Sequence, residues 1–234
     1  MNMSDIKIFI LVGGFGTRLK TVIDNIPKPM APINNKPFLS YKIEMIHQQL
    51  PKNQIYLLTH YMSDIIEEFF KDNKNVTVIK EKKPLGTGGS IKNAIKQLNL
   101  EDTQKIILMN GDTYIEPNYI DFIKNATADV NIMTSTIHQC DRFNTLEIED
   151  NRVTKFKSKK DNMIDKSINV GCYIFNNMGI IKNITEQVFS LEEKLKEMVN
   201  TTMIKSYQYD GVFIDIGTPD DYFRLINEKK NEKK

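Results

Sequence analysis

Apolar positions along this chain follow two different spacings. Short continuous apolar runs, typical of buried strands, lie at 6–12, 54–59, 76–80, 105–110 and 129–136. Stretches with helical spacing of the apolar residues lie at about 38–50, 63–72 and 88–98. Their alternation predicts βαβ units with right-handed crossovers and a mostly parallel sheet covered on both faces. In such sheets, ligands bind at the carboxyl ends of the strands.

The pattern changes in the second half of the chain. Thr145 to Phe156 predict a hairpin that turns at Asp150-Asn151, and Ile168 to Phe175 predict another strand. We expect this part to be an antiparallel insertion over one end of the cleft. Further along, Ser190 to Glu193 fit a capping box that starts a helix running to about Val199.

Composition limits the class of protein. The 234 residues suffice for one large α/β domain, and no break in composition indicates a second one. With 32 basic and 30 acidic residues the net charge is only +2, so neither nucleic acid nor a membrane is expected as a partner. Cys140 and Cys172 lack the spacing of metal ligands, and the sequence has neither a signal-peptide pattern nor a membrane-span pattern. A cytoplasmic location with reduced thiols is therefore expected.

Three glycines follow the first apolar run directly. Gly13, Gly14 and Gly16 predict a loop in which the backbone can approach a ligand closely. Arg18 and Lys28 add two cations beside this loop, a planar fork and a compact charge that both suit phosphate oxygens. The segment therefore predicts a site for a polyphosphorylated ligand. A glycine-rich turn with surface charges is the plainer alternative.

Two common phosphate-binding loops do not fit this segment. The P-loop continues into Gly-Lys-Ser/Thr, which is missing here. The dinucleotide fingerprint opens directly into a helix, whereas Pro27 and Pro29 soon interrupt any helix in this chain. An NAD-dependent oxidoreductase is therefore disfavoured.

Two carboxylates also follow apolar strings. Asp112 follows Leu-Met-Asn-Gly, and Asp215 follows Val-Phe-Ile. Carboxylates at strand ends suit Mg²⁺, a hard cation that fills its remaining positions with water and phosphate oxygens. Each Asp taken alone is equally typical of a helix cap or a turn, and Asp220 and Asp221 are expected to be such first-turn residues.

The chain resembles the sugar 1-phosphate nucleotidyltransferase family in four strings: Gly-Gly-x-Gly-Thr-Arg-Leu at 13–19, Pro-Lys-Pro at 27–29, Asn-Gly-Asp at 110–112 and Asp-Ile-Gly-Thr-Pro-x-Asp-Tyr at 215–222. The resemblance covers nearly the whole chain. It implies a Rossmann-like, doubly wound α/β fold of the GT-A-like nucleotidyltransferase type. Its implied parts are a nucleotide-binding part at about 1–140, a sugar-binding part at about 141–217 and a C-terminal helix at about 219–234.

The resemblance also implies an activity and a set of site residues. The implied partners are GTP, as donor of GMP, and a sugar 1-phosphate, and Phe-Ser-Leu-Glu at 189–192 is most similar to the branch that uses a heptose 1-phosphate. The implied catalytic residues are Arg18, Lys28, Asp112 and Lys159, with Mg²⁺ held by Asp112 and Asp215. The implied nucleotide-binding residues are Leu11, Gly13, Gly14, Gly16, Thr17, Glu81, Gly86, Thr87, Gly88 and Gly111. The implied sugar-binding residues are Asn169 and Gly171.

Gly86, Gly88 and Gly89 lie in a second glycine loop at 81–90, which leads into a helix whose N-terminal amides are expected to be free. The resemblance implies that this loop receives the base and ribose of the nucleotide.

Residues 81 and 158 bear on specificity. If Glu81 faces the base, its oxygens can accept from two adjacent N–H groups of guanine, whereas uracil and thymine offer one N–H between two carbonyls. An exposed Glu81 paired with Lys82 or Lys83 is the alternative. The family usually has a Glu that binds sugar hydroxyls at the position of Ser158, so this part of the resemblance does not carry over.

Other interpretations stay open. One is the same chemistry with UTP, CTP or dTTP and a hexose 1-phosphate, and another is an inactive nucleotide-sensing homologue. Lys157 or Lys155 could also take the phosphate-binding role of Lys159. The sequence leaves open whether the chain forms a homodimer.

Overall fold

The computed structural model describes residues 3–16, 19, 22–23, 25–137, 143–157 and 166–231. The long strands are β1 (Lys7–Leu11), β4 (Ile55–Thr59), β5 (Val76–Lys80), β6 (Ile106–Asn110), β8 (Val130–Ile137), β9 (Thr145–Glu149), β10 (Arg152–Lys157), β11 (Lys166–Phe175) and β12 (Ile204–Gln208). Two short pairs are β2 (Pro32–Ile33) with β3 (Lys36–Pro37), and β7 (Thr113–Tyr114) with β13 (Ile214–Asp215). The helices are α1 (Phe38–Gln49), α2 (Ser63–Phe70), α3 (Gly86–Gln97), α4 (Tyr119–Asn125), α5 (Gly179–Lys182), α6 (Leu191–Met198) and α7 (Pro219–Asn231).

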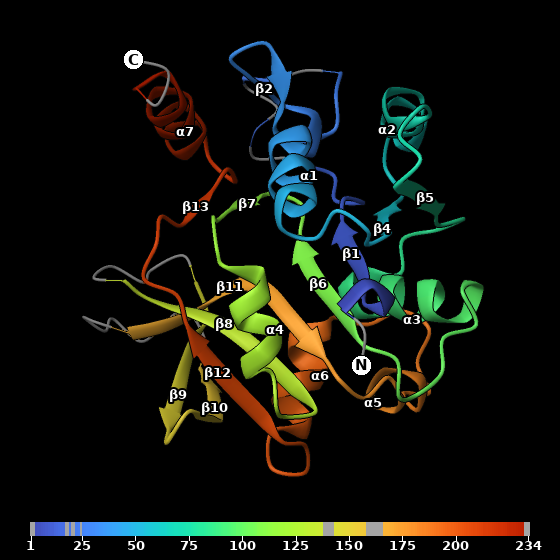
Figure 1. Ribbon diagram of the computed structural model, residues 1–234, viewed down its shortest axis with the longest axis vertical. Helices are drawn as coiled ribbons and strands as arrows, with labels where there is room; N and C mark the ends of the chain where they lie inside the picture. Colours follow the sequence, from blue (N-terminus) through green and yellow to red (C-terminus); the bar gives the residue numbers. More distant parts are fainter. Residues whose placement is uncertain are drawn as a thin grey trace.

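The long strands form one nine-stranded sheet in the order β5-β4-β1-β6-β11-β8-β12-β10-β9 (Figure 1). The strands β5, β4, β1 and β6 are parallel, as the alternating pattern predicts. Beyond them, β11 runs antiparallel to both β6 and β8, and the hairpin of β9 and β10 forms the far edge. The α/β prediction is therefore confirmed. The sheet is parallel in the half that carries the first glycine loop and mixed as a whole.

Local signals placed the hairpin and two helix starts correctly. Asp150 and Asn151 have φ angles of 48° and 61°, the left-handed values that a tight two-residue hairpin turn requires. The side chain of Ser190 accepts a hydrogen bond from the backbone N–H of Glu193 at 3.3 Å and starts α6. Asp220 and Asp221 lie in the first turn of α7, also as predicted.

Apolar side chains fill the space on both faces of the sheet. In β1, Ile8 and Ile10 point to the face covered by α1, α2 and α4. Phe9, between them in sequence, points to the face covered by α3, α5 and α6. Because both faces are buried, the strand sequence is a continuous apolar run rather than an alternating one.

A close approach between β6 and β1 shapes the edge where parallel strands end. The backbone N–H of Gly111 donates to the carbonyl oxygen of Leu11 at 2.9 Å. A Cβ at residue 111 would lie 2.4 Å from that oxygen, so only glycine fits. Consequently Asn110 and Asp112, on either side of Gly111, are held beside the end of β1.

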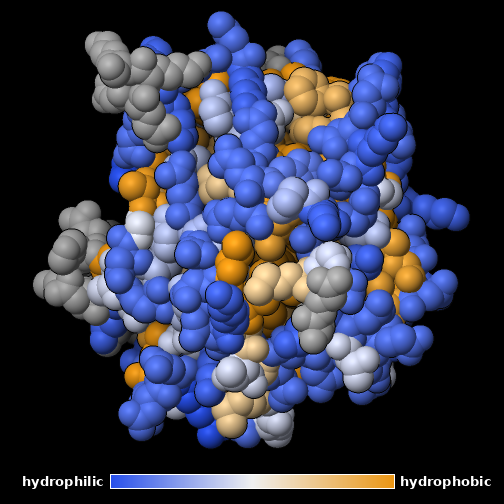
Figure 2. Space-filling view, viewed as in Figure 1, coloured by the Kyte–Doolittle hydropathy of each residue, from blue (hydrophilic) through white to orange (hydrophobic). Residues whose placement is uncertain are grey.

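Figure 2 shows one face of the molecule as largely hydrophilic, with hydrophobic residues in small patches. Among the helices of the described ranges, none combines the length and the apolar character needed to cross a membrane. Cys172 is a buried free thiol in β11, and Cys140 lies outside the described residues.

The charged side chain of Lys42 lies inside the fold. Lys42 on α1 has only 4% of its surface exposed. Desolvation lowers the pKa of its ammonium group from 10.5 to about 8, while nearby Cys172 and Asp112 act in the opposite direction. A buried cation of this kind costs folding free energy.

We expect Lys42→Met to raise the free energy of unfolding near neutral pH, because methionine fills a similar space without a charge. The pKa of Lys42 is lower in the folded protein than in the unfolded chain, so the folded protein loses its proton first as the pH rises. The wild type should therefore gain stability relative to Lys42→Met between about pH 8 and about pH 10.5. Urea unfolding of both proteins across this interval measures the difference. If the difference in unfolding free energy between the two proteins did not change with pH, the lowered pKa of Lys42 would be wrong.

Candidate active site

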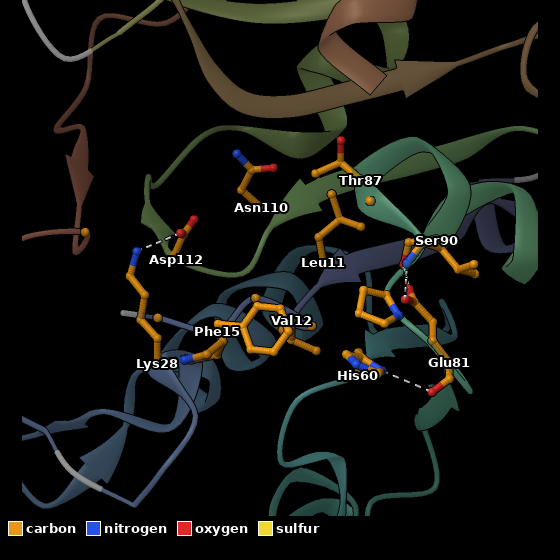
Figure 3. A pocket seen from close by; sticks show the side chains of 18 of the residues that line it. Leu11, Val12, Phe15, Lys28, His60, Glu81, Thr87, Ser90, Asn110 and Asp112 are labelled. Atoms are coloured by element: carbon orange, nitrogen blue, oxygen red, sulfur yellow. Dashed lines mark hydrogen bonds and ion pairs between the residues drawn. The ribbon is translucent and has the colours of Figure 1, made fainter. Parts of the chain in front are cut away.

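A cavity of about 420 Å³ opens at the carboxyl ends of the parallel strands (Figure 3). The glycine loop after β1 and the segment from Glu81 into the start of α3 both contribute to its lining. Its lining includes these predicted nucleotide-binding residues: Leu11, Gly13, Gly14, Gly16, Glu81, Gly86 and Thr87. Lys28 and Asp112 line it too. Thr17 and Arg18 lie outside the described residues.

The glycines of the first loop serve different purposes. Gly16 has a φ of +59°, and a Cβ there would lie 3.0 Å from the Cβ of Lys28. Gly13 passes close to the backbone of His60, whereas a Cβ on Gly14 would meet no atom within 4 Å. Backbone conformation and packing therefore require Gly16. At Gly14 the protein itself would tolerate a side chain, which leaves that space for a ligand.

Lys28 brings the two predicted metal-binding carboxylates together. Its Nζ lies 2.7 Å from Asp112 Oδ2 and 3.6 Å from Asp215 Oδ1. Asp215 lies in β13, and Asp112 directly precedes β7. These two short strands pair with each other. Only 10% of the Lys28 side chain is exposed, so solvent screens its attraction to the two carboxylates less than on the open surface. Within the described ranges, no cluster of three or more His, Cys, Asp or Glu side chains is positioned to hold a metal.

Glu81 lies at the other end of the cavity from Lys28 (Figure 3). One carboxylate oxygen accepts from the backbone N–H of Leu85 at 3.2 Å, and the other accepts from the hydroxyl of Ser90. The backbone oxygen of Glu81 also lies 3.3 Å from Nδ1 of His60. These hydrogen bonds of Glu81 stabilise the conformation of its own loop. A carboxylate has about four acceptor positions, so two remain for a ligand.

The second glycine loop differs from expectation. Its helix N-terminus was expected to present free amides, but the N–H groups of Gly88 and Gly89 donate to the carbonyl oxygen of Phe189 at 3.0 and 3.4 Å. A Cβ on Gly88 would lie 2.1 Å from the ring of Phe189, and a Cβ on Gly86 would lie 2.5 Å from its carbonyl oxygen. The expectation of free amides is therefore wrong for Gly88 and Gly89. Packing against residue 189 requires glycine at 86 and 88.

A second cavity, of about 460 Å³, adjoins the first. It is lined by Asn110, Phe143, Asn144, Leu146, Phe156, Lys157, Asn169, Tyr173, Ser190, Glu192, Glu193, Lys196 and Asp215. Lys157 therefore contributes a cation there, whereas Lys155 is exposed and outside this lining. Ser158 and Lys159 lie outside the described residues. Of the described residues, Asn110 and Glu192 line both cavities.

The predicted sugar-binding pair occupies two different environments. Asn169 lines the second cavity, and its Oδ1 accepts from the N–H of Gly171 at 2.8 Å. Gly171 itself does not line the cavity. With a φ of +74°, it leaves room for the side chain of Asn110, whose Nδ2 would lie 2.4 Å from a Cβ at 171. Gly171 thus positions Asn110.

Sequence reasoning missed several lining residues. His60 follows β4 directly, just as Val12 follows β1, so its place after a parallel strand was the available signal. Asn110 stands next to the predicted Gly111 and Asp112. Lys196 lies in the last turn of α6 and carries no comparable signal, because an exposed helical lysine is ordinary.

Comparison with known proteins agrees with this arrangement. Residues 7–232 match the family described as nucleotidyl transferase. The chain belongs to this family. The nucleotidyltransferase fold expected from the sequence is thereby confirmed.

Individual relatives are similar over almost the whole chain. D-glycero-alpha-D-manno-heptose 1-phosphate guanylyltransferase of Campylobacter jejuni is 34% identical over 228 residues, which cover 94% of this chain and 98% of the relative. The enzyme with the same name from Aneurinibacillus thermoaerophilus is 35% identical over 233 residues, with 95% and 97% covered. The crystal structure of HddC from Yersinia pseudotuberculosis is 35% identical, with a TM-score of 0.84 over 95% of this chain and 99% of that one. HddC complexed with GMP-PN matches with a TM-score of 0.81 at 36% identity.

For the two glycine loops of this nucleotidyltransferase we expect opposite sensitivities. Gly88→Ala should lower the free energy of unfolding by about 1–3 kcal/mol, because the added Cβ overlaps the ring of Phe189. Gly14→Ala is the matched control and should change it by less than about 0.5 kcal/mol, since its Cβ meets no protein atom. Urea unfolding without ligand gives both values. Equal losses would contradict the packing role of Gly88.

Proposed function

We propose that the protein transfers GMP from GTP to D-glycero-α-D-manno-heptose 1-phosphate, forming GDP-heptose and pyrophosphate. The observation that carries this proposal is the meeting of two cavities at Asn110, beside the cluster of Lys28, Asp112 and Asp215. Two reactants lying in these cavities would bring their phosphates together at that cluster. The similarity to two heptose 1-phosphate guanylyltransferases supports the choice of substrates.

The proposed chemistry is an in-line displacement. A phosphate oxygen of the sugar 1-phosphate attacks the α-phosphorus of GTP, the bond from that phosphorus to the bridging oxygen breaks, and pyrophosphate leaves. A sugar phosphate dianion is already a competent nucleophile, so the reaction needs no general base and no covalent enzyme intermediate. The enzyme's contribution is then alignment and charge stabilisation.

Each group of phosphate-binding residues has a proposed role. Lys28 stabilises the α-phosphate, and the amides of the loop at 13–16, together with Arg18, bind the leaving phosphates. Lys159 or Lys157 binds the phosphate of the sugar. Only Lys157 of these two is described, and it lines the second cavity.

The metal is proposed from the chemistry of the donors. Asp112 and Asp215 both approach the same ammonium group, at 2.7 and 3.6 Å, which supports a cation site shared by the two carboxylates. Oxygen donors of this kind fit Mg²⁺, with GTP phosphates and water completing the shell. Bound there, Mg²⁺ would neutralise charge on the phosphates. The cytoplasmic location, the single domain and a homodimer stay predictions.

A substrate panel tests the proposed function directly. Purified protein with Mg²⁺ should release pyrophosphate fastest with GTP and the heptose 1-phosphate, when GTP, UTP, CTP and dTTP are each paired with heptose, mannose and glucose 1-phosphates. A preference for UTP or dTTP would remove the guanylyl assignment and keep nucleotidyl transfer. Absence of turnover with every pair would favour the nucleotide-sensing alternative.

We expect Asp112→Asn to lower turnover by orders of magnitude and to change the free energy of unfolding much less. The amide keeps the shape but loses the charge that would hold Mg²⁺, while Asp215 still faces Lys28. Asp210→Asn, at an exposed residue outside both cavity linings, is the control and should keep wild-type turnover. Steady-state rates with excess Mg²⁺ and with excess EDTA provide the measurement. Undiminished turnover in EDTA would exclude the metal from the mechanism.

Glu81→Gln should reduce kcat/KM for GTP about 10-fold or more, because one acceptor oxygen becomes a donor that faces guanine's own donors. The KM for the sugar 1-phosphate should change little. Competition among GTP, UTP, CTP and dTTP shows whether Glu81 recognises the guanine base or only stabilises the conformation of its loop. If Glu81 only braces the loop through Leu85 and Ser90, all nucleotides should weaken equally, and the guanine-reading role would be wrong.

A further inference from the structure

Glu192 occupies the boundary between the two cavities. It lies in the first turn of α6 and lines both of them. Its Oε2 accepts from the hydroxyl of Thr87 and from the hydroxyl of Ser190, each at 3.0 Å. Burial, with a further contribution from the charge of Glu192, raises the pKa of Tyr173 well above its ordinary value, so the carboxylate also lies near that hydroxyl.

The backbone around Glu192 is fixed to the nucleotide-binding half. Phe189 N–H donates to the carbonyl oxygen of Leu85 at 3.0 Å, and Leu191 N–H donates to the hydroxyl of Thr87 at 2.8 Å. Phe189 also fills the space left by Gly86 and Gly88. The carboxylate at 192 is therefore held at a defined place rather than carried on a mobile surface side chain.

Glu192 retains capacity to bind a ligand. A carboxylate has about four acceptor positions, and the hydroxyls of Thr87, Ser190 and Tyr173 account for at most three of them. The neighbouring lining of the second cavity carries the amides of Asn110, Asn144 and Asn169. A carboxylate among amides suits a ligand rich in hydroxyl groups, because each hydroxyl donates one hydrogen bond and can accept others.

The charges in the second cavity indicate which part of the ligand faces Glu192. A carboxylate repels a phosphate, and the same lining carries two cations that suit one: Lys157, which also pairs with Glu147, and Lys196. Glu193 also lines this cavity, but it is exposed to solvent, and the Thr87 and Ser190 hydroxyls donate to the carboxylate of Glu192. Glu192 is therefore the carboxylate best placed to bind uncharged polar groups.

We propose that Glu192 accepts hydrogen bonds from ring hydroxyls of the sugar 1-phosphate and determines sugar specificity. It thereby supplies the carboxylate that the family resemblance places at residue 158, where this chain has serine. This inference rests on the proposed nucleotidyl transfer to a sugar 1-phosphate. It assigns Glu192 to the acceptor sugar and not to the ribose of the nucleotide.

The test compares Glu192→Gln with Glu197→Gln. Glutamine keeps an oxygen for Thr87 and Ser190 but loses the charge, and Glu197, on the same helix, is 62% exposed and outside both linings. We expect Glu192→Gln to raise the KM for the heptose 1-phosphate about 10- to 100-fold, with the KM for GTP within about twofold of wild type. Glu197→Gln should match wild type in both.

Monodeoxy analogues of the heptose 1-phosphate identify which sugar hydroxyl donates to Glu192. The wild type should discriminate against the analogue that lacks the bound hydroxyl, and Glu192→Gln should lose most of that discrimination, which a purely structural residue would not affect. Unchanged sugar KM, or an equal rise in the KM for GTP, would overturn the proposal.

The sugar 1-phosphate that the wild type uses distinguishes a wrong substrate assignment from a wrong role for Glu192. If it uses another sugar 1-phosphate in place of the heptose, the proposed substrate is wrong. Glu192 is then tested in the same way with the sugar that is used and its monodeoxy analogues.

Discussion

The site depends on the contact between the end of β6 and the end of β1. Gly111 lies so close to the Leu11 carbonyl that no larger residue fits. This contact fixes the positions of Asn110 and Asp112, the residues on either side of Gly111. Asn110 reaches the boundary of the two cavities, and Asp112 reaches Lys28. Without that approach, the residue at the boundary and the residue at the ion pair would not belong to the same site.

A second contact joins the two halves of the protein across the site. Phe189 packs into the space of Gly86 and Gly88 and bonds to the start of α3, so α6 is held against the loop that begins at Glu81. The two glycine-rich loops therefore differ in physical purpose. The first leaves open space at Gly14, whereas in the second the space at Gly86 and Gly88 is filled by Phe189.

The charges of the first cavity are separated along its length. Lys28 and Asp112 form one end, where Asp215 of the second cavity's lining also approaches Lys28. Glu81, which accepts a hydrogen bond from Ser90, lies at the other end. A nucleotide has the same polarity, with phosphates at one end and a hydrogen-bonding base at the other. Glu192 adds a fixed carboxylate at the boundary where the second cavity begins.

The sequence by itself determined the elements whose signals are local. A strand buried on both faces must be continuously apolar, so β1, β4 and β6 were readable, and Asp150-Asn151 tolerate the left-handed conformation that the hairpin turn requires. Only the tertiary structure decided that β11 pairs antiparallel with β6, that Gly88 serves Phe189 and that Gly171 makes room for Asn110. Residue spacing records which side chains are buried, but it does not record which distant segment buries them. Roles set by contacts between residues far apart in sequence, Glu192 with Thr87 among them, therefore emerged only from the fold.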